Sequence, residues 1–373
     1  MGTARSTITW LHRYLGLSLA ILLSFAGITG SLVAFQSELH AWLNRDLLAL
    51  CVDAPALPLQ ELIARVERQR PLARVVAVPL EPLAQSGPHL LLLSVSPRTA
   101  QALPYDQIWV DAATAKLLAE RKFNANVLDR RHLMSLIFRL HSSLLLGNTG
   151  NLILGSLASL WLVTTLFGLV LAWPRAGHWR TLLALQWHSH RLRFRFDLHR
   201  IIGLLSAPIF VLVSLTAVYF TLDFLHPLVN RALPSSEWPT EGLPERNFEQ
   251  ASLPPETALA LAKAQFADAK LSGLRLDYTH GVYQVALRRP TDIGRNIENL
   301  VFVDMQQPRV VTQWTPARRQ AGDEFDVWQL PLHTGQFLGL AGRILWCIAG
   351  FLPLLLVWSA VSVWWGKRKR RKT

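Results

Sequence analysis

The sequence predicts an α-helical membrane protein with four transmembrane helices, arranged in two parallel-repeat halves, and with two small α+β modules outside the membrane. Three observations lead to this fold class. Apolar residues gather in four long runs, basic residues gather in short segments beside those runs, and a histidine motif occurs twice. The chain has 373 residues, of which 51% are hydrophobic, and its formal net charge is +13.

Each of the four apolar runs is long enough to cross a bilayer, which takes about 20 mostly apolar residues. We predict spans at Leu15–Phe35, Leu152–Trp173, Ile201–Phe220 and Ile344–Trp365. The first run is longer than the core of a signal peptide and lacks a clear small-residue cleavage site after it. We therefore expect it to be an uncleaved anchor.

The basic residues predict the orientation of the spans. The segment 174–196 carries five arginines and no acid, and Lys367–Lys372 is a run of basic residues. Short basic loops stay in the cytoplasm. We expect both termini and this loop to be cytoplasmic and the two long segments that hold most of the acids to lie outside. Since topology explains the positive charge, we expect the lipid bilayer and no nucleic acid as a partner.

The chain then divides into eight parts. They are transmembrane helix 1 (residues 1–37), a first external module with an interfacial histidine segment (38–146), transmembrane helix 2 (147–174), a basic cytoplasmic loop (175–196), transmembrane helix 3 (197–222), a second external module with an interfacial histidine segment (223–339), transmembrane helix 4 (340–366) and a basic cytoplasmic tail (367–373).

Two histidine motifs recur along the chain. "WLHRYLGL" begins at Trp10 and "DLHRIIGL" at Asp197, so that His12 matches His199 and Gly16 matches Gly203, 187 positions apart. Before the second and fourth spans, "LHSSLLLGNTGN" and "LHTGQFLGLAGR" match His141 with His333, 192 positions apart. A parallel repeat of this kind builds sites at the interface between its halves.

Each external segment has the pattern of one helix followed by strands. Helical periodicity covers 58–69 in the first and 254–266 in the second. Strand patterns follow at 74–80, 89–96 and 107–120, and at 271–278, 281–289 and 299–314. Trp109-Val110-Asp111 aligns with Phe302-Val303-Asp304. We expect each module to be one helix on a short antiparallel sheet.

The duplicated His-Arg-x-x-Gly motif, the Leu-His before the second and fourth spans, and modules that end in Val-Asp together resemble the PepSY-associated transmembrane proteins. That family consists of bacterial inner-membrane proteins, many linked to iron uptake, and some act as ferric-siderophore reductases. The resemblance implies an inner-membrane location with PepSY-like modules in the periplasm. The module endings here, "VDAATAK" and "VDMQQPR", differ from the usual Val-Asp-x-x-Thr-Gly.

Ionisable side chains in membrane spans are costly and point to function, and imidazole is a common ligand of haem iron. We expect two bis-histidine haems b, one held by His12 and His199 on the cytoplasmic side and one by His141 and His333 outside. His40 and His226 are the alternates for the outer site.

Neighbouring residues of the motif fit the same cofactor. Gly16 and Gly203, one turn past the ligands, leave room for a porphyrin edge, and Arg13 and Arg200 could pair with its propionates. The competing interpretation is structural, because small residues in membrane helices usually serve close helix packing.

We therefore expect an inner-membrane haem protein that passes electrons from a cytoplasmic donor or a membrane quinol to a ferric siderophore in the periplasm. No catalytic residue is predicted; the substrate surface is expected on the external modules, with Trp238, Trp314, Trp328, Arg288 and Arg289. Two alternatives remain open. The chain could be a non-enzymatic membrane-anchored module protein that regulates peptidases, or a permease for a metal or siderophore.

Overall fold

The computed structural model describes residues 2–85, 87–174, 182–187, 190–290, 292 and 299–370. The chain forms two compact units. The membrane unit consists of Met1–Gln36, Ile137–Val229 and Gln329–Thr373, and the sheet unit of Ser37–Leu136 and Asn230–Trp328. Part of the expected basic loop (175–181 and 188–189) and the last three residues of the basic tail lie outside the described residues.

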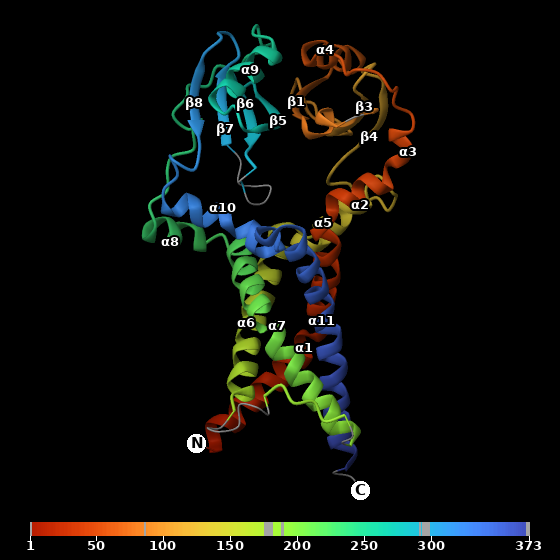
Figure 1. Cartoon of the computed structure of the whole chain (residues 1–373), viewed down its shortest axis with the longest axis vertical. Coiled ribbons are helices and arrows are strands. Elements are labelled where there is room, and N and C mark those ends of the chain that lie inside the picture. The colour runs from red at the N-terminus through yellow and green to blue at the C-terminus, as the bar shows by residue number, and fades with distance from the viewer. Residues whose placement is uncertain are drawn as a thin grey trace. The chain divides into compact units, whose positions relative to one another are not determined.

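Four long helices make up the core of the membrane unit: α1 (Gly2–Ala34), α6 (Asn148–Ala172), α7 (Arg191–Thr221) and α11 (Gly339–Arg370). All four are long and apolar enough to cross a membrane, which confirms the four predicted spans. Helix α1 packs on α6 and α11, and α7 packs on the same two helices, so that α1 and α7 occupy opposite corners of a four-helix bundle. Helix α1 begins and α11 ends at the same end of this bundle (Figure 1).

Glycines allow the close approach of α1 and α11. A Cβ atom on Gly27 would collide with the backbone oxygen of Gly350, and a Cβ on Gly350 would meet Ser31 Oγ and the Gly27 oxygen. The Ser31 hydroxyl also donates to the Cys347 carbonyl at 2.9 Å. Small residues at this crossing therefore serve helix packing, as the structural interpretation expects.

Several other helices are short. They are α2 (Gln36–Leu43) and α3 (Arg45–Leu48), which lie in or lead into the sheet unit, and α5 (Leu133–Ser143), α8 (Leu225–Ala232), α10 (Ala321–Thr334) and the 3₁₀ turn η3 (Gln336–Leu338), which lie wholly or partly in the membrane unit. His141 lies near the end of α5 and His333 near the end of α10. The chain turns from these helices into α6 and α11 at Gly147 (φ 57°) and Gly339 (φ 63°). Both have positive φ with ψ near −140°, a conformation open essentially to glycine alone, so the matched glycines have a backbone role.

The sheet unit contains two sets of a helix and four strands. The first set is α4 (Leu59–Gln69), β1 (Ala73–Pro79), η1 (Glu81–Ala84), β2 (Leu90–Pro97), β3 (Gln107–Asp111) and β4 (Leu117–Arg121). The second is α9 (Pro255–Gln265), β5 (Lys270–Asp277), β6 (Val282–Arg288), β7 (Asn299–Asp304) and β8 (Val310–Trp314). The two helices and the eight strands lie where their sequence patterns predicted them, while the turn η1 was not predicted.

The two sets share one sheet, which the separate sequence patterns did not predict. Its eight antiparallel strands follow the order β4-β3-β2-β1-β5-β6-β7-β8, and Ala77 of β1 pairs with Arg275 of β5. An edge strand leaves a row of backbone N–H and C=O groups unpaired, and this pairing satisfies both inner edges. Helices α4 and α9 contribute to one hydrophobic core, and the Gln60 amide donates to Glu256 Oε1 at 3.0 Å.

The aligned aspartates have a local structural role. Asp111 Oδ2 accepts from the Thr114 hydroxyl at 2.6 Å, and Asp304 Oδ1 accepts from the Gln306 amide at 2.8 Å. Each carboxylate thus closes the turn between the last two strands of its set. These bonds account for the recurrence of Val-Asp without assigning a ligand to it.

Candidate functional site

The structure brings His12 of α1 and His199 of α7 together across the bundle. The centroids of their rings are 6.3 Å apart and the ring planes make an angle of 75°. His12 Nδ1 lies 2.9 Å from the Thr164 carbonyl oxygen, and His199 Nδ1 lies 3.1 Å from the Leu356 carbonyl and 3.0 Å from Ser359 Oγ. Because a carbonyl only accepts, each Nδ1 carries the proton, and each Nε2 keeps its lone pair.

His141 of α5 and His333 of α10 form a second pair. Their ring centroids are also 6.3 Å apart, at an angle of 51°. His141 Nδ1 lies 3.2 Å from Thr29 Oγ1, and His333 Nδ1 lies 2.8 Å from Thr216 Oγ1. Each threonine hydroxyl donates to a backbone carbonyl of its own helix at 2.9 Å, so it accepts from the imidazole. These two histidines therefore also have a free Nε2 lone pair.

The spacing within each pair suits two imidazoles on opposite sides of one metal ion. A ring nitrogen lies about 1.2 Å from the centre of its ring and a metal–imidazole bond is about 2.0 Å long, so such rings have centroids about 6.4 Å apart. Both observed separations are 6.3 Å. Fixing Nδ1 by a hydrogen bond is also the usual way in which a protein orients a ligating histidine.

The donor set limits which metal these pairs suit. Among the described residues no cluster of three or more histidine, cysteine, aspartate or glutamate side chains could hold a metal ion. A structural zinc site needs four protein ligands and a calcium site needs six or more oxygens. Two opposed imidazoles are sufficient when the remaining ligands come from a planar tetrapyrrole, as in a bis-histidine haem.

Gly16 and Gly203, one turn past His12 and His199, do not lie at close helix contacts. A Cβ on Gly16 would meet only Thr164 Cγ2, at 3.7 Å, and a Cβ on Gly203 would meet only Leu356 Cδ2, at 4.0 Å. These are ordinary contacts, unlike the collisions that a Cβ on Gly27 or Gly350 would cause. Gly16 and Gly203 are thus not required for the close approach of neighbouring helices, because a Cβ on either would make only an ordinary van der Waals contact.

Other glycines seat the histidine rings. A Cβ on Gly30 would lie 2.8 Å from His141 Cε1, and a Cβ on Gly168 would lie 3.1 Å from His12 Cε1. Sequence reasoning missed these two glycines and the hydroxyl partners of the rings. A usable signal existed for Thr29 and Thr216, which are 187 positions apart, as His12 and His199 are.

The two arginines of the motif lie in different surroundings. Arg200 forms an ion pair with the buried Asp197 at 3.2 Å and donates to the carbonyls of Leu182 and Ala184. Arg13 is exposed on α1. The role of these arginines as propionate partners stays a prediction, and Arg200 already has other partners.

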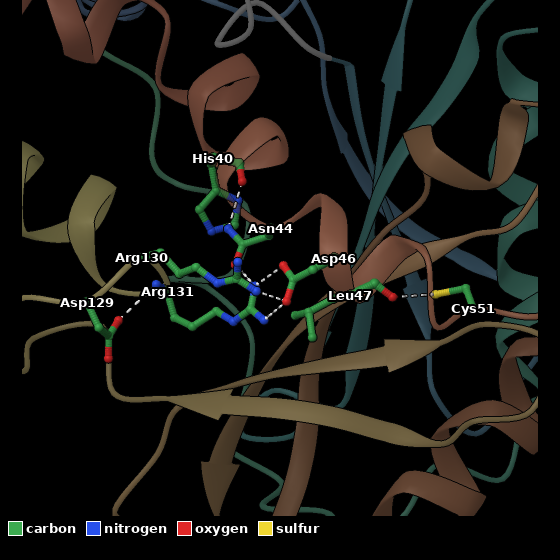
Figure 2. A network of polar contacts seen from close by, with 8 residues as sticks. All are labelled: His40, Asn44, Asp46, Leu47, Cys51, Asp129, Arg130 and Arg131. Carbon is green, nitrogen blue, oxygen red and sulfur yellow. Dashed lines mark hydrogen bonds and ion pairs between the residues drawn. The ribbon is translucent and has the colours of Figure 1, made fainter.

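The alternate ligand His40 belongs to the sheet unit. Its ring stacks on Trp109 with centroids 5.7 Å apart at 15°, and its buried Nε2 has no hydrogen-bond partner. Burial, assisted by the charges of Arg121 and Arg131, lowers the pKa of His40 to about 4. Asn44 joins this region to a polar network, because its amide donates to the His40 carbonyl and accepts from Arg131 (Figure 2).

The other alternate, His226, lies in the membrane unit. The centroid of its ring lies 4.4 Å from that of Tyr219. Neither alternate shows the pairing and Nδ1 fixation that distinguish the other four histidines.

The residues expected at the substrate surface mostly have partners within the sheet unit. Arg288 forms an ion pair with Glu81 at 2.7 Å, and Arg289 forms one with Asp268 at 3.5 Å. Trp238 and Trp314 pack on each other with centroids 5.4 Å apart. Trp238 is 39% exposed and the side chain of Arg289 is 38% exposed, so both reach the surface of the sheet unit.

The fold and the histidines define a class: a membrane protein with four candidate spans, two histidine pairs in its membrane unit, and an α+β sheet unit. A family model described as the PepSY-associated TM region matches residues 9–367, and the chain belongs to this family, which confirms the resemblance found in the sequence. No curated protein matches the chain.

Proposed function

We propose that the protein carries two haems b and conducts electrons across the bacterial inner membrane to ferric siderophores in the periplasm. The observation that supports this most is the pairing of imidazoles in each of two layers, with ring centroids 6.3 Å apart in both pairs and Nδ1 fixed by a hydrogen bond in all four rings. A buried imidazole N–H needs a partner whatever its role, so it is the pairing at matched positions in both layers that favours ligation.

The two layers are far enough apart to serve the two sides of a membrane. Thr29, which holds His141, lies 17 residues beyond His12 on α1, and Thr216, which holds His333, lies 17 residues beyond His199 on α7. At 1.5 Å per residue this is about 26 Å, close to the thickness of the hydrocarbon core. With both termini in the cytoplasm, His12 and His199 form the inner pair, on the side where electrons enter. His141 and His333 form the outer pair, on the periplasmic side.

Haem supplies the one-electron chemistry when bound; the protein orients it and sets its potential. The hydrogen bonds from Nδ1–H to carbonyl and hydroxyl oxygens make each Nε2 a stronger electron-pair donor to a metal and keep each ring from rotating. Gly16 and Gly203 put no side chain on the helix surface one turn past His12 and His199, which would leave room for the edge of the haem. A cytoplasmic donor or a membrane quinol supplies the electron.

The expected reaction transfers one electron to Fe(III) held by a siderophore. The hard oxygen donors of a siderophore hold Fe(III) far more tightly than the softer Fe(II). Reduction therefore releases the metal while the organic ligand stays intact. Trp238 and Trp314 of the sheet unit are the candidates for contact with the siderophore.

The alternatives predict different properties. A permease for a bare metal ion needs more ligands than the two imidazoles of each layer, and a peptidase regulator needs no paired histidines within its membrane unit. A visible spectrum with a haem assay on the purified chain separates them. We expect a Soret band and two haems per polypeptide; a protein that stays colourless after haem is supplied during expression and during purification would exclude the proposal.

A further inference from the structure

A hollow of about 370 Å³ opens at the end of the membrane unit where α7 begins. It is lined by Trp187, Arg191, Phe194, Arg195 and Trp358. The Arg195 guanidinium lies 5.4 Å from the centre of the Trp358 ring, and the rings of Trp187 and Phe194 are 5.7 Å apart. Two arginines and three aromatic rings thus surround one space.

The two arginines of the hollow differ from their neighbours on α7. Arg193 and Arg200 flank Asp197, whose side chain is completely buried, each at 3.2 Å. No acidic side chain of the described part of the chain forms an ion pair with Arg191 or Arg195, although both line the hollow. The hollow therefore holds two positive charges that the described residues leave uncompensated.

We propose that this hollow binds the phosphate group of an anionic phospholipid. Guanidinium groups bind phosphate through two parallel hydrogen bonds, and basic pockets between membrane helices on the cytoplasmic side bind anionic headgroups. Trp358 lies on the spanning helix α11 and is 47% exposed, so the acyl chains can follow that helix. Tryptophan is also enriched at the level of the headgroups.

The bound headgroup joins α7 to α11 beside the inner histidine pair. Arg195 precedes His199 by one helical turn, and Trp358 is next to Ser359, whose hydroxyl contacts His199. A phosphate held between Arg195 and the α11 side of the hollow thus stabilises the junction that orients His199. This role needs no haem and stands independently of the proposed function.

Native mass spectrometry of the full chain in a neutral detergent tests the lipid site. We expect phosphatidylglycerol to bind more tightly than phosphatidylcholine, and the double substitution Arg191→Gln with Arg195→Gln to weaken it about 30-fold, since each cation near a membrane surface contributes a factor of about five. The matched control, Lys367→Gln with Arg368→Gln, removes the same charge at the same end of the bundle and should change binding less than threefold.

Equal binding of the two lipids, or equal losses in the two double variants, would overturn the site. Should the double variant fail to fold by circular dichroism, the single substitution Arg195→Gln carries the same test with about a fivefold loss. Inorganic phosphate and flavin mononucleotide serve as competitors: displacement of phosphatidylglycerol by either at an equal concentration would overturn the lipid assignment in favour of a soluble phosphate ligand.

Discussion

The rings of His12 and His199 lie with their centroids 6.3 Å apart, and each Nδ1 atom is bonded to a backbone carbonyl of another helix, that of Thr164 on α6 for His12 and that of Leu356 on α11 for His199. Their partners Thr164 and Leu356 are 192 positions apart on α6 and α11, while the histidines are 187 apart on α1 and α7. The same bond is thus made twice, by matched positions of the four helices. This regularity supports a shared task for the two rings.

The ligand pairing predicts which histidines belong to one cofactor. His12→Ala and His199→Ala should each remove the same haem, and His141→Ala and His333→Ala should each remove the other, because each leaves one iron with a single axial ligand. Haem per polypeptide should fall from two to one in all four variants. Loss of the outer haem in His40→Ala or His226→Ala instead would show that the outer pairing is wrong.

Removing the hydroxyl partners of the histidine rings should weaken haem retention to different degrees. Thr216→Val removes the acceptor of the His333 Nδ1 proton and should weaken haem retention about 10- to 100-fold. Ser359→Ala should have a smaller effect, because His199 keeps its bond to the Leu356 carbonyl. Competition with apomyoglobin measures the retention. Equal effects of the two substitutions would contradict the assigned roles of the hydroxyls.

Substitutions of two glycines should separate the effect on cofactor binding from the effect on folding. Gly203→Leu should place a side chain beside His199 and lower haem content while the helices stay packed, because the nearest atom to a Cβ there, Leu356 Cδ2, is 4.0 Å away. Gly350→Leu should disrupt the crossing of α1 and α11 and destabilise the whole membrane unit. Haem content and thermal unfolding followed by circular dichroism report on both. A Gly203→Leu protein that unfolds early yet keeps its haem would favour the packing interpretation.

His40 predicts a pH dependence of the sheet unit. Its pKa is lowered from 6.5 in the unfolded chain to about 4 in the folded protein. Between these two pH values the unfolded chain binds a proton at His40 and the folded chain does not, so protonation favours unfolding. The contribution of His40 to the free energy of unfolding of the sheet unit is therefore highest above pH 6.5 and decreases as the pH falls towards 4. His40→Gln removes this contribution, so the difference in free energy of unfolding between wild type and variant should shift across that window. A difference that is constant from pH 7 to 4 would contradict it.

Local patterns predicted most of the elements, while their distant pairings required the structure. The periodic pattern of apolar residues predicted α4 and β1–β4 correctly. The residues of β1 do not indicate that β5 is its neighbour, because strands pair through backbone groups that nearly every residue has. The partners of His12 and His199 were hidden for the same reason, since Thr164 and Leu356 act through their carbonyls. The histidine pairs themselves were predictable, because the repeat placed them in register. The neighbour of Arg200 was also visible, as Asp197 stands three residues before it.

The most direct measurement of the central claim follows the reoxidation of the reduced protein by its substrate. Proteoliposomes that contain the chemically reduced chain receive a ferric hydroxamate siderophore while the haem absorbance and the trapping of Fe(II) by a ferrous chelator are recorded. We expect the haem bands to return to the oxidised form as Fe(II) appears, and His333→Ala to abolish this while its inner haem stays reducible. Haem that stays reduced in the presence of the siderophore, or a His333→Ala protein that produces Fe(II) at the wild-type rate, would contradict the proposed function.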